Sequence, residues 1–276
     1  MKIKAHAKLN FYLEILGRRD DGFHNLTSIM QQILLHDVLV FNHSDQDQWL
    51  YRNRPMPPYN LVARALTLLR EHVDVPPVKL ELRKQIPIGA GLGGGSSDAA
   101  ATLVGLDRFF SLGLAMETLR QLAATLGSDV PFFIDTPAAL VEGTGTKITP
   151  LPPLDIPHIL LARPRGKIST VAAYNELTPA DYRLAGEAED FTALWNRGIL
   201  GTCFNHLEAP VFRLDPKIEH LKQVMLSTEP IQCLMTGSGN VVFAIYSSKD
   251  DLYQARKIIA PAAAWVRASA TLKGIE

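Results

Sequence analysis

The 276-residue sequence predicts an α+β protein built from two domains. Three observations support this: strand-like runs dominate the first 55 residues, helical and strand patterns alternate after them, and a proline-rich stretch divides the chain. That stretch, residues 150–157, holds four prolines in eight positions, a composition typical of a rigid connection. We therefore predict an N-terminal domain at residues 1–152 and a C-terminal domain at residues 153–276.

The predicted N-terminal domain begins with strands. Runs of branched and aromatic residues separated by Gly, Asp and Asn are typical of strands joined by turns. Such runs occupy residues 3–7, 11–16, 28–35 and 38–43. A helix is expected over residues 60–73, where apolar residues recur at helical spacing and Asn60 can cap the first turn. A strand is expected over residues 78–86, where apolar and charged residues alternate.

Helices and strands then alternate to the end of the chain. Apolar residues at helical spacing predict helices over residues 96–110 and 116–126, and Gly127 is expected to end the second. In the C-terminal domain the predicted strands are 158–162, 231–235, 241–246 and 265–271, and the predicted helices 170–177, 190–197, 215–226 and 249–259. This order is typical of a small split α/β sandwich.

Composition excludes several classes of protein. The 28 Lys and Arg balance 28 Asp and Glu, so no overall basic surface exists for nucleic-acid phosphates, and we expect no nucleic-acid partner. Two cysteines are too few for a disulfide framework. No stretch resembles a membrane span or a signal peptide. We therefore expect a soluble, cytoplasmic protein without a membrane partner.

The strongest functional signal is a glycine cluster between a predicted strand and a predicted helix. Five glycines occupy the seven positions from Gly89 to Gly95, and the helix that follows begins with two serines. Glycine tolerates positive φ and the close approach of a ligand, and a helix N-terminus attracts anions. We expect this loop to bind phosphate.

Three other interpretations of the loop are a hinge, a dinucleotide-binding turn and a Walker loop. Gly89, Gly91 and Gly94 satisfy G-x-G-x-x-G. Against a dinucleotide-binding turn, the preceding strand is charged on one face, Pro87 interrupts the junction, and no second strand end is available for a ribose. No lysine precedes Ser96, as a Walker loop requires. A nicotinamide-binding oxidoreductase remains the alternative from another class.

Five motifs together resemble those of the GHMP superfamily of small-molecule kinases. They follow the order and spacing of that superfamily over essentially the whole chain: AKLN at 7–10, DGFH at 21–24, PIGAGLGGGSS at 87–97, LGSDVP at 126–131 and TGSG at 236–239. The resemblance implies a ribosomal-S5-like N-terminal domain and a ferredoxin-like C-terminal domain, with the active site between them. It also implies ATP and Mg²⁺ as cofactors and phosphoryl transfer to an alcohol.

The AKLN and DGFH motifs narrow the expected substrate. They imply transfer of the γ-phosphoryl group to the tertiary C2 hydroxyl of a diphosphocytidyl-methylerythritol, in the synthesis of isoprenoid precursors without mevalonate. A kinase for another small alcohol, such as homoserine or mevalonate, is the alternative within the superfamily. A non-catalytic paralogue would be expected to lack Lys8 or Asp129, and both are present.

The resemblance also implies roles for individual residues on the substrate side. Asp129 is expected to take the hydroxyl proton, and Lys8 to lower the pKa of that hydroxyl and keep Asp129 ionised. His24 is expected to bind cytosine through ring hydrogen bonds and Phe23 by stacking, although the family commonly has Tyr at the position of Phe23. Further substrate contacts are expected from Asn10, Thr170 and Tyr174.

The expected ATP site includes the whole glycine loop and two residues outside it. The loop positions are Pro87, Ile88, Gly89, Ala90, Gly91, Leu92, Gly93, Gly94, Gly95, Ser96 and Ser97. Asn60 and Lys84 align with positions near the adenine, but Asn60 is equally a helix cap and Lys84 equally an exposed strand residue. The Mg²⁺ ligands are unassigned, with Ser96 and Ser97 as candidates.

Three further positions depart from the family pattern. His6 stands where Pro is usual, His206 replaces an Asp, and Asn240 follows TGSG where a small residue or Pro is common. None of these changes removes an expected catalytic group, but they leave a shift in substrate tolerance open. Closure of the polar stretch 178–190 over the substrate is a further open question.

Overall fold

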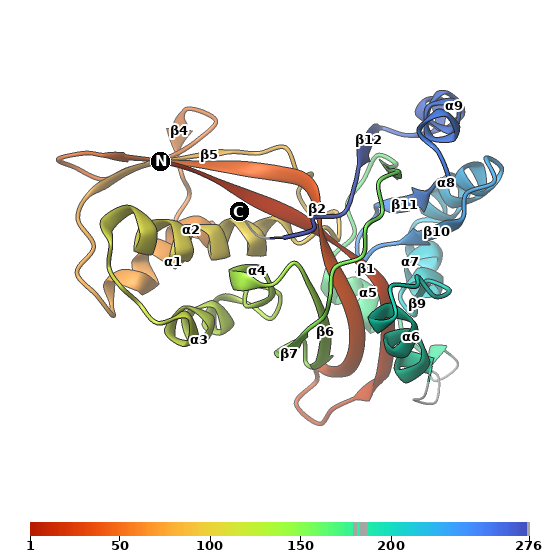
Figure 1. The fold of residues 1–276 in the computed structure, drawn as a ribbon, viewed down its shortest axis with the longest axis horizontal. Helices are drawn as coiled ribbons and strands as arrows, with labels where there is room; N and C mark the ends of the chain where they lie inside the picture. Colours follow the sequence, from red (N-terminus) through yellow and green to blue (C-terminus); the bar gives the residue numbers. More distant parts are fainter. Residues whose placement is uncertain (179–180, 183–186, 275–276) are drawn as a thin grey trace. The chain divides into compact units, whose positions relative to one another are not determined.

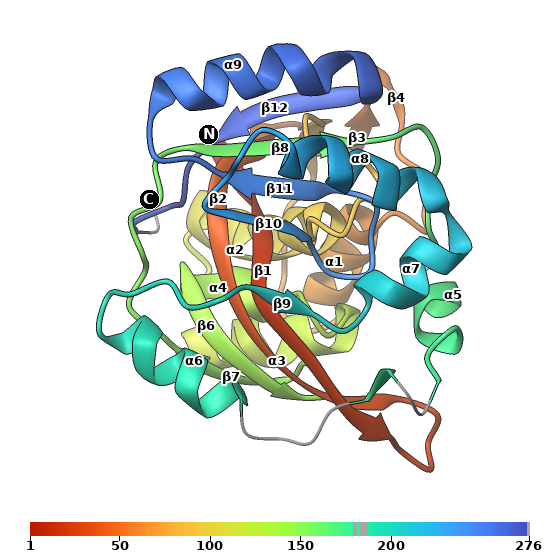
Figure 2. The same cartoon turned by 90° about the vertical axis from the view of Figure 1, so that its right-hand side faces the viewer.

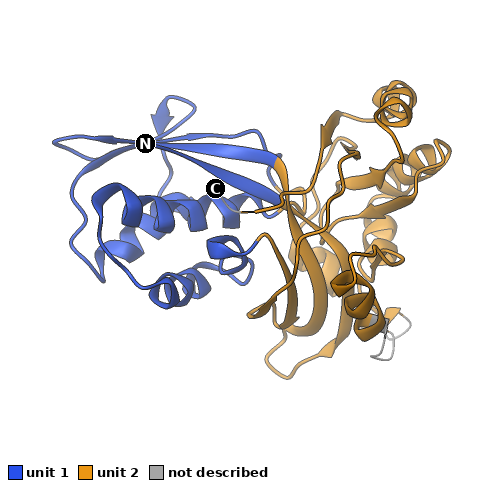
Figure 3. Ribbon diagram, viewed as in Figure 1, with its two compact units in different colours: residues 1–7, 35–88, 93–136 blue, residues 8–34, 89–92, 137–276 orange. Residues whose placement is uncertain are grey.

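The computed structural model describes residues 1–178, 181–182 and 187–274, drawn in two views in Figure 1 and Figure 2. The chain divides into two compact units (Figure 3). Unit 1 consists of residues 1–7, 35–88 and 93–136, and unit 2 of residues 8–34, 89–92 and 137–276. The boundary predicted between residues 152 and 153 falls inside unit 2 and stays a prediction about domains.

Unit 1 combines a strand layer with helices. Its strands are β3 (Gln48–Tyr51), β4 (Arg54–Pro55), β5 (Val78–Arg83), the second half of β2 (His24–His43) and the start of β1 (Lys2–Arg18), in the order β4-β3-β5-β2-β1. Its helices are α1 (Leu61–Arg70), α2 (Gly94–Phe110), α3 (Met116–Leu126) and the short α4 (Phe132–Asp135). Helix α2 packs closely on the strands, because a Cβ at Gly105 would lie 2.5 Å from the Phe41 ring.

Unit 2 contains the four-stranded sheet β10-β11-β8-β12, in which neighbouring strands are antiparallel. These strands are β8 (Ile159–Arg163), β10 (Gln232–Met235), β11 (Val242–Ile245) and β12 (Trp265–Ser269). Helices α8 (Pro216–Leu226) and α9 (Lys249–Ile259) cover one face of this sheet (Figure 2). The remaining helices are α5 (Thr170–Asn175), α6 (Glu187–Asn196), α7 (Glu208–Leu214) and the 3-10 turn η2 (Ala260–Ala262).

Unit 2 also contains strand pairings outside this sheet, among them that of β1 with β2. Strand β6 (Ala138–Gly143) pairs antiparallel with the first half of β2, and β7 (Lys147–Pro150) pairs antiparallel with β6. The two-residue strand β9 (Phe204–Asn205) runs parallel to β1 (Lys2–Arg18), with Tyr12 opposite Phe204. An isolated antiparallel bridge joins Ile33 to Thr271. Residues from the start of the chain are therefore integral to the sheets of its C-terminal part.

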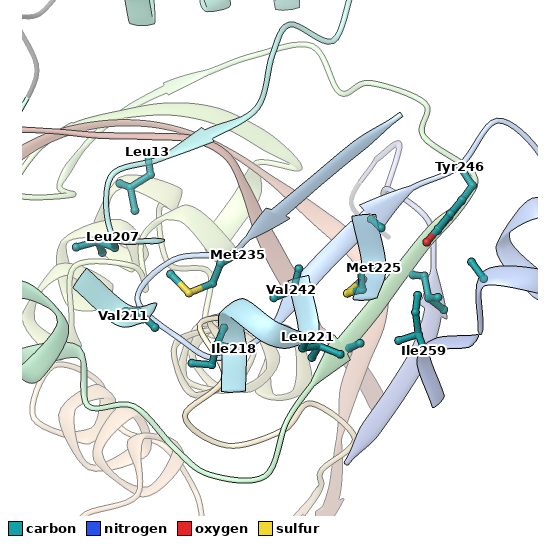
Figure 4. Packing of buried hydrophobic residues seen from close by; sticks show 14 of the residues in the cluster. Leu13, Leu207, Val211, Ile218, Leu221, Met225, Met235, Val242, Tyr246 and Ile259 are labelled. Carbon is teal, nitrogen blue, oxygen red and sulfur yellow. The ribbon is translucent and has the colours of Figure 1, made fainter. Parts of the chain in front are cut away.

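The hydrophobic core of unit 2 also combines residues from the start of the chain with residues from its C-terminal part (Figure 4). Leu13 and Ile15 of β1 are buried together with Leu160 of β8, Val242 of β11 and Leu221 of α8. Burial of such a side chain stabilises the fold by about 1.5–3 kcal/mol relative to leaving it exposed. The buried side chains Leu13 and Ile15 of β1 therefore help to stabilise the C-terminal part of the chain.

The structure corrects two strand predictions. The turns expected between residues 7 and 11 and between 35 and 38 do not form, because β1 and β2 are continuous strands. The polar residues that suggested turns are buried with partners: Asn10 Nδ2 donates to Ser28 Oγ at 2.8 Å, and Asp37 Oδ1 accepts from the Ile86 N–H at 2.8 Å. A buried polar side chain with partners is compatible with a strand interior.

Most predicted helices are confirmed, and several short elements were not predicted. Asn60 caps α1, since its Oδ1 accepts from the Val62 N–H at 2.9 Å. Helix α2 begins at Gly94, two residues earlier than expected, and α3 ends at Leu126 before an extended Gly127. The unpredicted elements are β3, β4, α4, β6, β7, β9 and α7. No helix in the described ranges is long and apolar enough to cross a membrane.

Candidate active site

Three glycines of the first glycine-rich loop, residues 87–95, adopt the left-handed conformation. Their φ angles are 66° at Gly89, 75° at Gly91 and 69° at Gly93. Side chains with a Cβ rarely adopt these angles, so the loop requires glycine at alternate positions.

The first glycine-rich loop contacts a second one, residues 236–239, within unit 2. A Cβ at Gly91 would overlap the carbonyl oxygen of Thr236 and would lie 2.9 Å from the Gly239 nitrogen. A Cβ at Gly239 would lie 2.5 Å from the Ala90 carbonyl oxygen. Glycines at these positions therefore allow direct contact between two backbones, which the sequence alone did not predict.

Helix α2 begins at the end of the first glycine-rich loop without a side-chain cap. Its N-cap is Gly93, whereas α1, α8 and α9 are capped by the side chains of Asn60, Asp215 and Ser248. The first N–H groups of α2 therefore lack a capping side chain, and the positive end of the helix dipole lies at the loop. This arrangement suits an anion, as the sequence analysis expected.

Lys8 and Asn10 lie on β1 beside the second glycine-rich loop. The Lys8 side chain is buried, with the residue only 4% exposed, and its Nζ donates to Asn10 Oδ1. The backbone N–H of Asn10 donates to Thr236 Oγ1 at 3.0 Å, and Lys8 Nζ lies 3.2 Å from the position of a Cβ at Gly237. The ammonium group is thus held at this loop by hydrogen bonds to strand β1.

A series of contacts continues from the second glycine-rich loop to His24. Ser238 Oγ lies 2.9 Å from Thr170 Oγ1, at the start of α5. Tyr174, one turn further along α5, places its ring centroid 5.1 Å from that of His24. The structure therefore brings five of the expected residues together in unit 2: Lys8, Asn10, Thr170, Tyr174 and His24. Phe23, which precedes His24 in the chain, is 65% exposed.

The surroundings of His24 disfavour its charged form. Burial, followed by the charge of Arg18, lowers the pKa of His24 below its ordinary value of 6.5. A neutral imidazole has one donor and one acceptor nitrogen. Tyr182 also lies near it, with ring centroids 6.5 Å apart and nearly parallel planes. Tyr182 was not predicted, and residues 179–180 and 183–186 of the stretch 178–190 lie outside the described residues.

Asp129 belongs to unit 1, in the turn between α3 and α4. The turn is closed by a 3.1 Å hydrogen bond from the Val130 N–H to the Gly127 carbonyl, and Asp129 is partly exposed. Because Lys8 belongs to unit 2, the expected pairing of Lys8 with Asp129 stays a prediction.

The Lys84 side chain is only 9% exposed and the residue follows the end of β5, so its interpretation as an exposed strand residue is wrong. Its Nζ forms ion pairs with Asp37 and, at 2.6 Å, with Asp98 on α2. The same Nζ lies 3.3 Å from the position of a Cβ at Gly94, the first residue of α2. Burial raises the pKa of Asp98 to about 8. The positive charge of Lys84 opposes this shift, and the negative charge of Asp37 adds to it. This cluster was missed because residues 37, 84 and 98 are joined only by the fold.

The departures from the family pattern have structural partners. His206 Nδ1 accepts from the Ile15 N–H at 2.7 Å and so joins β9 to β1. Asn240 Nδ2 donates to the Gly166 carbonyl at 2.8 Å. Asn205 Nδ2, which sequence reasoning did not single out, donates to the carbonyls of Met235 and Gly237 at 2.8 Å and so supports the second glycine-rich loop. His6 lies 5.2 Å from His36, between ring centroids.

The described residues contain no group of three or more His, Cys, Asp or Glu that could hold a metal ion. Mg²⁺ in phosphoryl-transfer enzymes is typically held by one or two protein groups together with substrate phosphates and water. Ser96 and Ser97 lie in the first turn of α2, and their assignment to Mg²⁺ stays a prediction.

Comparison with known proteins agrees with the fold. The family described as GHMP kinases N terminal domain matches residues 60–142. A crystal structure of homoserine kinase from Cytophaga hutchinsonii superposes with a TM-score of 0.73 at 17% identity, covering 100% of this chain and 95% of that one, which shows the shared fold. The chain thus has the fold of the GHMP kinases, a class of small-molecule kinases, and the predicted two-domain α+β fold class is confirmed.

More similar proteins define the family within this class. A curated relative from Moorella thermoacetica, named 4-diphosphocytidyl-2-C-methyl-D-erythritol kinase, is 38% identical over 255 residues, covering 89% of this chain and 90% of that protein. A relative of the same name from Thermodesulfovibrio yellowstonii is 36% identical, with 92% of each covered. A crystal structure of 4-(cytidine 5'-diphospho)-2C-methyl-D-erythritol kinase superposes with a TM-score of 0.84 at 31% identity over 98% of both chains. The chain belongs to the 4-diphosphocytidyl-2-C-methyl-D-erythritol kinase family.

Proposed function

We propose that this kinase transfers the γ-phosphoryl group of ATP to the 2-hydroxyl of 4-diphosphocytidyl-2-C-methyl-D-erythritol. The observation that carries the proposal is the series of contacts in unit 2 that runs from Lys8 and Asn10 through the second glycine-rich loop to Thr170, Tyr174 and His24. These are the residues expected on the substrate side, and the names of the relatives support the same substrate.

The first glycine-rich loop and the N-terminus of α2 form the proposed phosphate site for ATP. The uncapped N–H groups of α2 can donate to phosphate oxygens, and the helix dipole favours their negative charge. Mg²⁺, held by Ser96 or Ser97 when bound, would neutralise charge on the phosphates. Phosphoryl transfer depends mainly on positioning and charge stabilisation, so such a site supplies much of what the reaction needs.

Proton transfer from the acceptor hydroxyl is assigned to Asp129. Lys8, oriented by Asn10, favours the ionised form of the hydroxyl because its positive charge stabilises the developing oxyanion. The partial exposure of Asp129 leaves its carboxylate accessible to a substrate. Asn60, already engaged as a cap of α1, and Lys84, engaged by two carboxylates, stay assigned near the adenine as predictions.

Recognition of cytosine is assigned to His24 with the rings around it. A neutral imidazole can donate one hydrogen bond and accept another, and cytosine offers an acceptor nitrogen beside a donor amino group. The lowered pKa of His24 keeps this pattern of donor and acceptor available at neutral pH. The exposed Phe23 ring is available for stacking on the base.

Coupled release of ADP tests the proposal directly. The purified protein is given ATP and Mg²⁺ with 4-diphosphocytidyl-2-C-methyl-D-erythritol, with homoserine, or with mevalonate. We expect turnover with the first alcohol and none above background with the others. Turnover only with homoserine or mevalonate would replace the proposed substrate, and no turnover with any of the three would contradict the proposal.

A further inference from the structure

A basic loop of unit 2 lies beside both glycine-rich loops. This basic loop, residues 164–168 between β8 and α5, carries Arg165 and Lys167, and Arg163 precedes it as the last residue of β8. Asn240, the residue that follows the second glycine-rich loop, donates from Nδ2 to the Gly166 carbonyl at 2.8 Å and so connects the basic loop to it. Three cations in five positions are a local concentration of positive charge in a chain whose net charge is zero.

The side chain of Lys167 extends along the first glycine-rich loop. Its Cδ and Cγ lie 3.9 and 4.0 Å from the position of a Cβ at Gly89, which is van der Waals distance. The residue is exposed, and within the described ranges its ammonium group forms no hydrogen bond or ion pair. Lysine stems often lie on a protein surface while the charged end stays in water. Here the stem lies on the side of Gly89 on which a Cβ would stand, next to the loop that is assigned to phosphate.

A cation beside Gly89 would supply positive charge for binding phosphate at the first glycine-rich loop. Residues 89–92 of the first glycine-rich loop offer only backbone dipoles, and Lys8 is hydrogen-bonded to Asn10 beside the second loop. Both proposed substrates carry a chain of phosphates, and lysine binds phosphate as a flexible point charge. The position of Lys167 next to Gly89 thus adds a charge where the loop itself has none.

We propose that Lys167 is a further positioning residue, which binds a diphosphate group at the first glycine-rich loop. The inference rests on the proposed function, because the diphosphate belongs either to ATP or to the diphosphocytidyl group of the acceptor. It adds to that function a residue of this chain that none of the five sequence motifs contains.

Calorimetric titration of Lys167→Met tests this inference with inorganic pyrophosphate, ADP and CDP as probes. We expect pyrophosphate affinity to fall about threefold to tenfold, the range of a partly exposed ion pair. Adenosine and cytidine, which lack phosphate, should bind to the variant and the wild type equally. A loss confined to ADP identifies ATP as the source of the diphosphate, and a loss confined to CDP identifies the acceptor.

Two further variants separate position from general charge. Arg165→Met removes the same charge from the same loop, and it should leave all three affinities within twofold of wild type. Lys167→Arg keeps a charge on a long stem and should restore pyrophosphate binding. In turnover assays, Lys167→Met should raise the KM of one substrate while kcat stays within about twofold, as expected for loss of uniform binding.

The inference is overturned if Lys167→Met binds pyrophosphate, ADP and CDP as the wild type does, if Arg165→Met shows the same loss, or if the wild type binds none of the three. The pyrophosphate measurement does not depend on the acceptor. A wild type that fails to turn over the proposed substrate, but loses pyrophosphate affinity on Lys167→Met, would therefore contradict the proposed function and support the diphosphate site.

Discussion

Asp98 lies in the interior of unit 1 between Lys84 and Asp37. Its Oδ1 has no hydrogen-bond partner within the described ranges, and the Asp37 side chain is fully buried. Two carboxylates facing one ammonium group leave an excess negative charge, which is costly away from water. Protonation of Asp98 removes this charge, and this is the physical reason why its pKa rises to about 8.

The Asp98 cluster makes stability depend on pH. An unfolded chain releases the Asp98 proton near the ordinary pKa of 3.8, while the folded chain keeps it up to about 8. Between these values the folded state binds more protons, so the free energy of unfolding falls as pH rises from about 5 to about 8. In Asp98→Asn, the part of this decrease in the free energy of unfolding that Asp98 causes should disappear. Urea unfolding at about pH 5 and at about pH 8 measures it.

Asp74→Asn is the control for this measurement, because Asp74 is an exposed carboxylate in the same unit. It should lose as much stability between the two pH values as the wild type does. An equal loss in Asp98→Asn would show that Asp98 is ionised in the folded protein throughout this range.

Asp129 is the residue on which the proposed chemistry depends most. Asp129→Asn should lower kcat at least ~100-fold, the lower range for loss of a general base, and leave ATP affinity nearly unchanged. Single-turnover kinetics with separately measured ATP binding checks both parts. Asp135→Asn is the control, since this carboxylate lies nearby on α4 and pairs with Arg120 at the surface. Turnover of Asp129→Asn near that of Asp135→Asn would refute the assignment.

At the scale of elements, the first glycine-rich loop serves packing as well as ligand binding. Gly91→Ala places a Cβ against the Thr236 carbonyl at a φ of 75°, so it should lower the free energy of unfolding by about 2 kcal/mol or more. Gly95→Ala adds a methyl group in the first turn of α2, 3.4 Å from Leu61 Cδ1. It should be neutral or stabilise by up to ~1 kcal/mol, because alanine favours a helix.

Thermal and urea unfolding of the two glycine variants give the comparison. If Gly91→Ala and Gly95→Ala have equal stabilities, the contact between the two glycine-rich loops is not required for folding. A destabilised Gly91→Ala that still binds ATP normally would show that the glycine there is needed for packing alone.

Elements with local signals were predictable from the sequence. Helices α1 and α3 follow from apolar spacing and, for α1, from the Asn60 cap, and β5 follows from alternation. The continuity of β1 and β2 was not predictable, because the partners of Asn10 and Asp37 are 18 and 49 residues away along the chain. The two residues of β9 have no periodicity at all, and they form a strand only because β1 lies beside them.

The residues of the candidate site likewise fall into those that the sequence predicts and those that it does not. The motifs identified the first glycine-rich loop, Lys8, Asn10 and His24 because those residues lie in recognisable short segments. Tyr182 and the partners of Lys84 stand outside such segments and meet their neighbours only in the folded protein. Contacts between residues distant in the chain cannot be read from local patterns, whatever the strength of each pattern.

At the scale of the whole molecule, residues 8–34 complete unit 2. Gln31 Nε2 donates to the carbonyls of Leu154 and Leu272 at 2.9 and 3.0 Å, and Leu13 is part of the core around α8. A fragment of residues 153–276 lacks these partners and should show no cooperative unfolding transition. Adding a fragment of residues 1–152 should restore the transition, as followed by near-ultraviolet circular dichroism.

A cooperative transition of the 153–276 fragment alone would contradict this expectation. It would also support the domain boundary that the proline-rich stretch predicts, because a domain is expected to fold by itself. The wild-type chain, unfolded under the same conditions, provides the reference signal.

The two long strands also determine the order in which the chain can fold during its synthesis. All residues of unit 1 precede position 137, so this unit is complete once Thr136 has left the ribosome. Unit 2 needs Ala270 and Leu272, which bond to the backbone of Leu34 and Gln32 at 2.8 Å. Until then residues 8–34 can pair with each other and with β6 but lack their partners from residues 154–272, and unpaired strand edges promote aggregation. A segment made at the very beginning of translation therefore waits for partners that are made at its end.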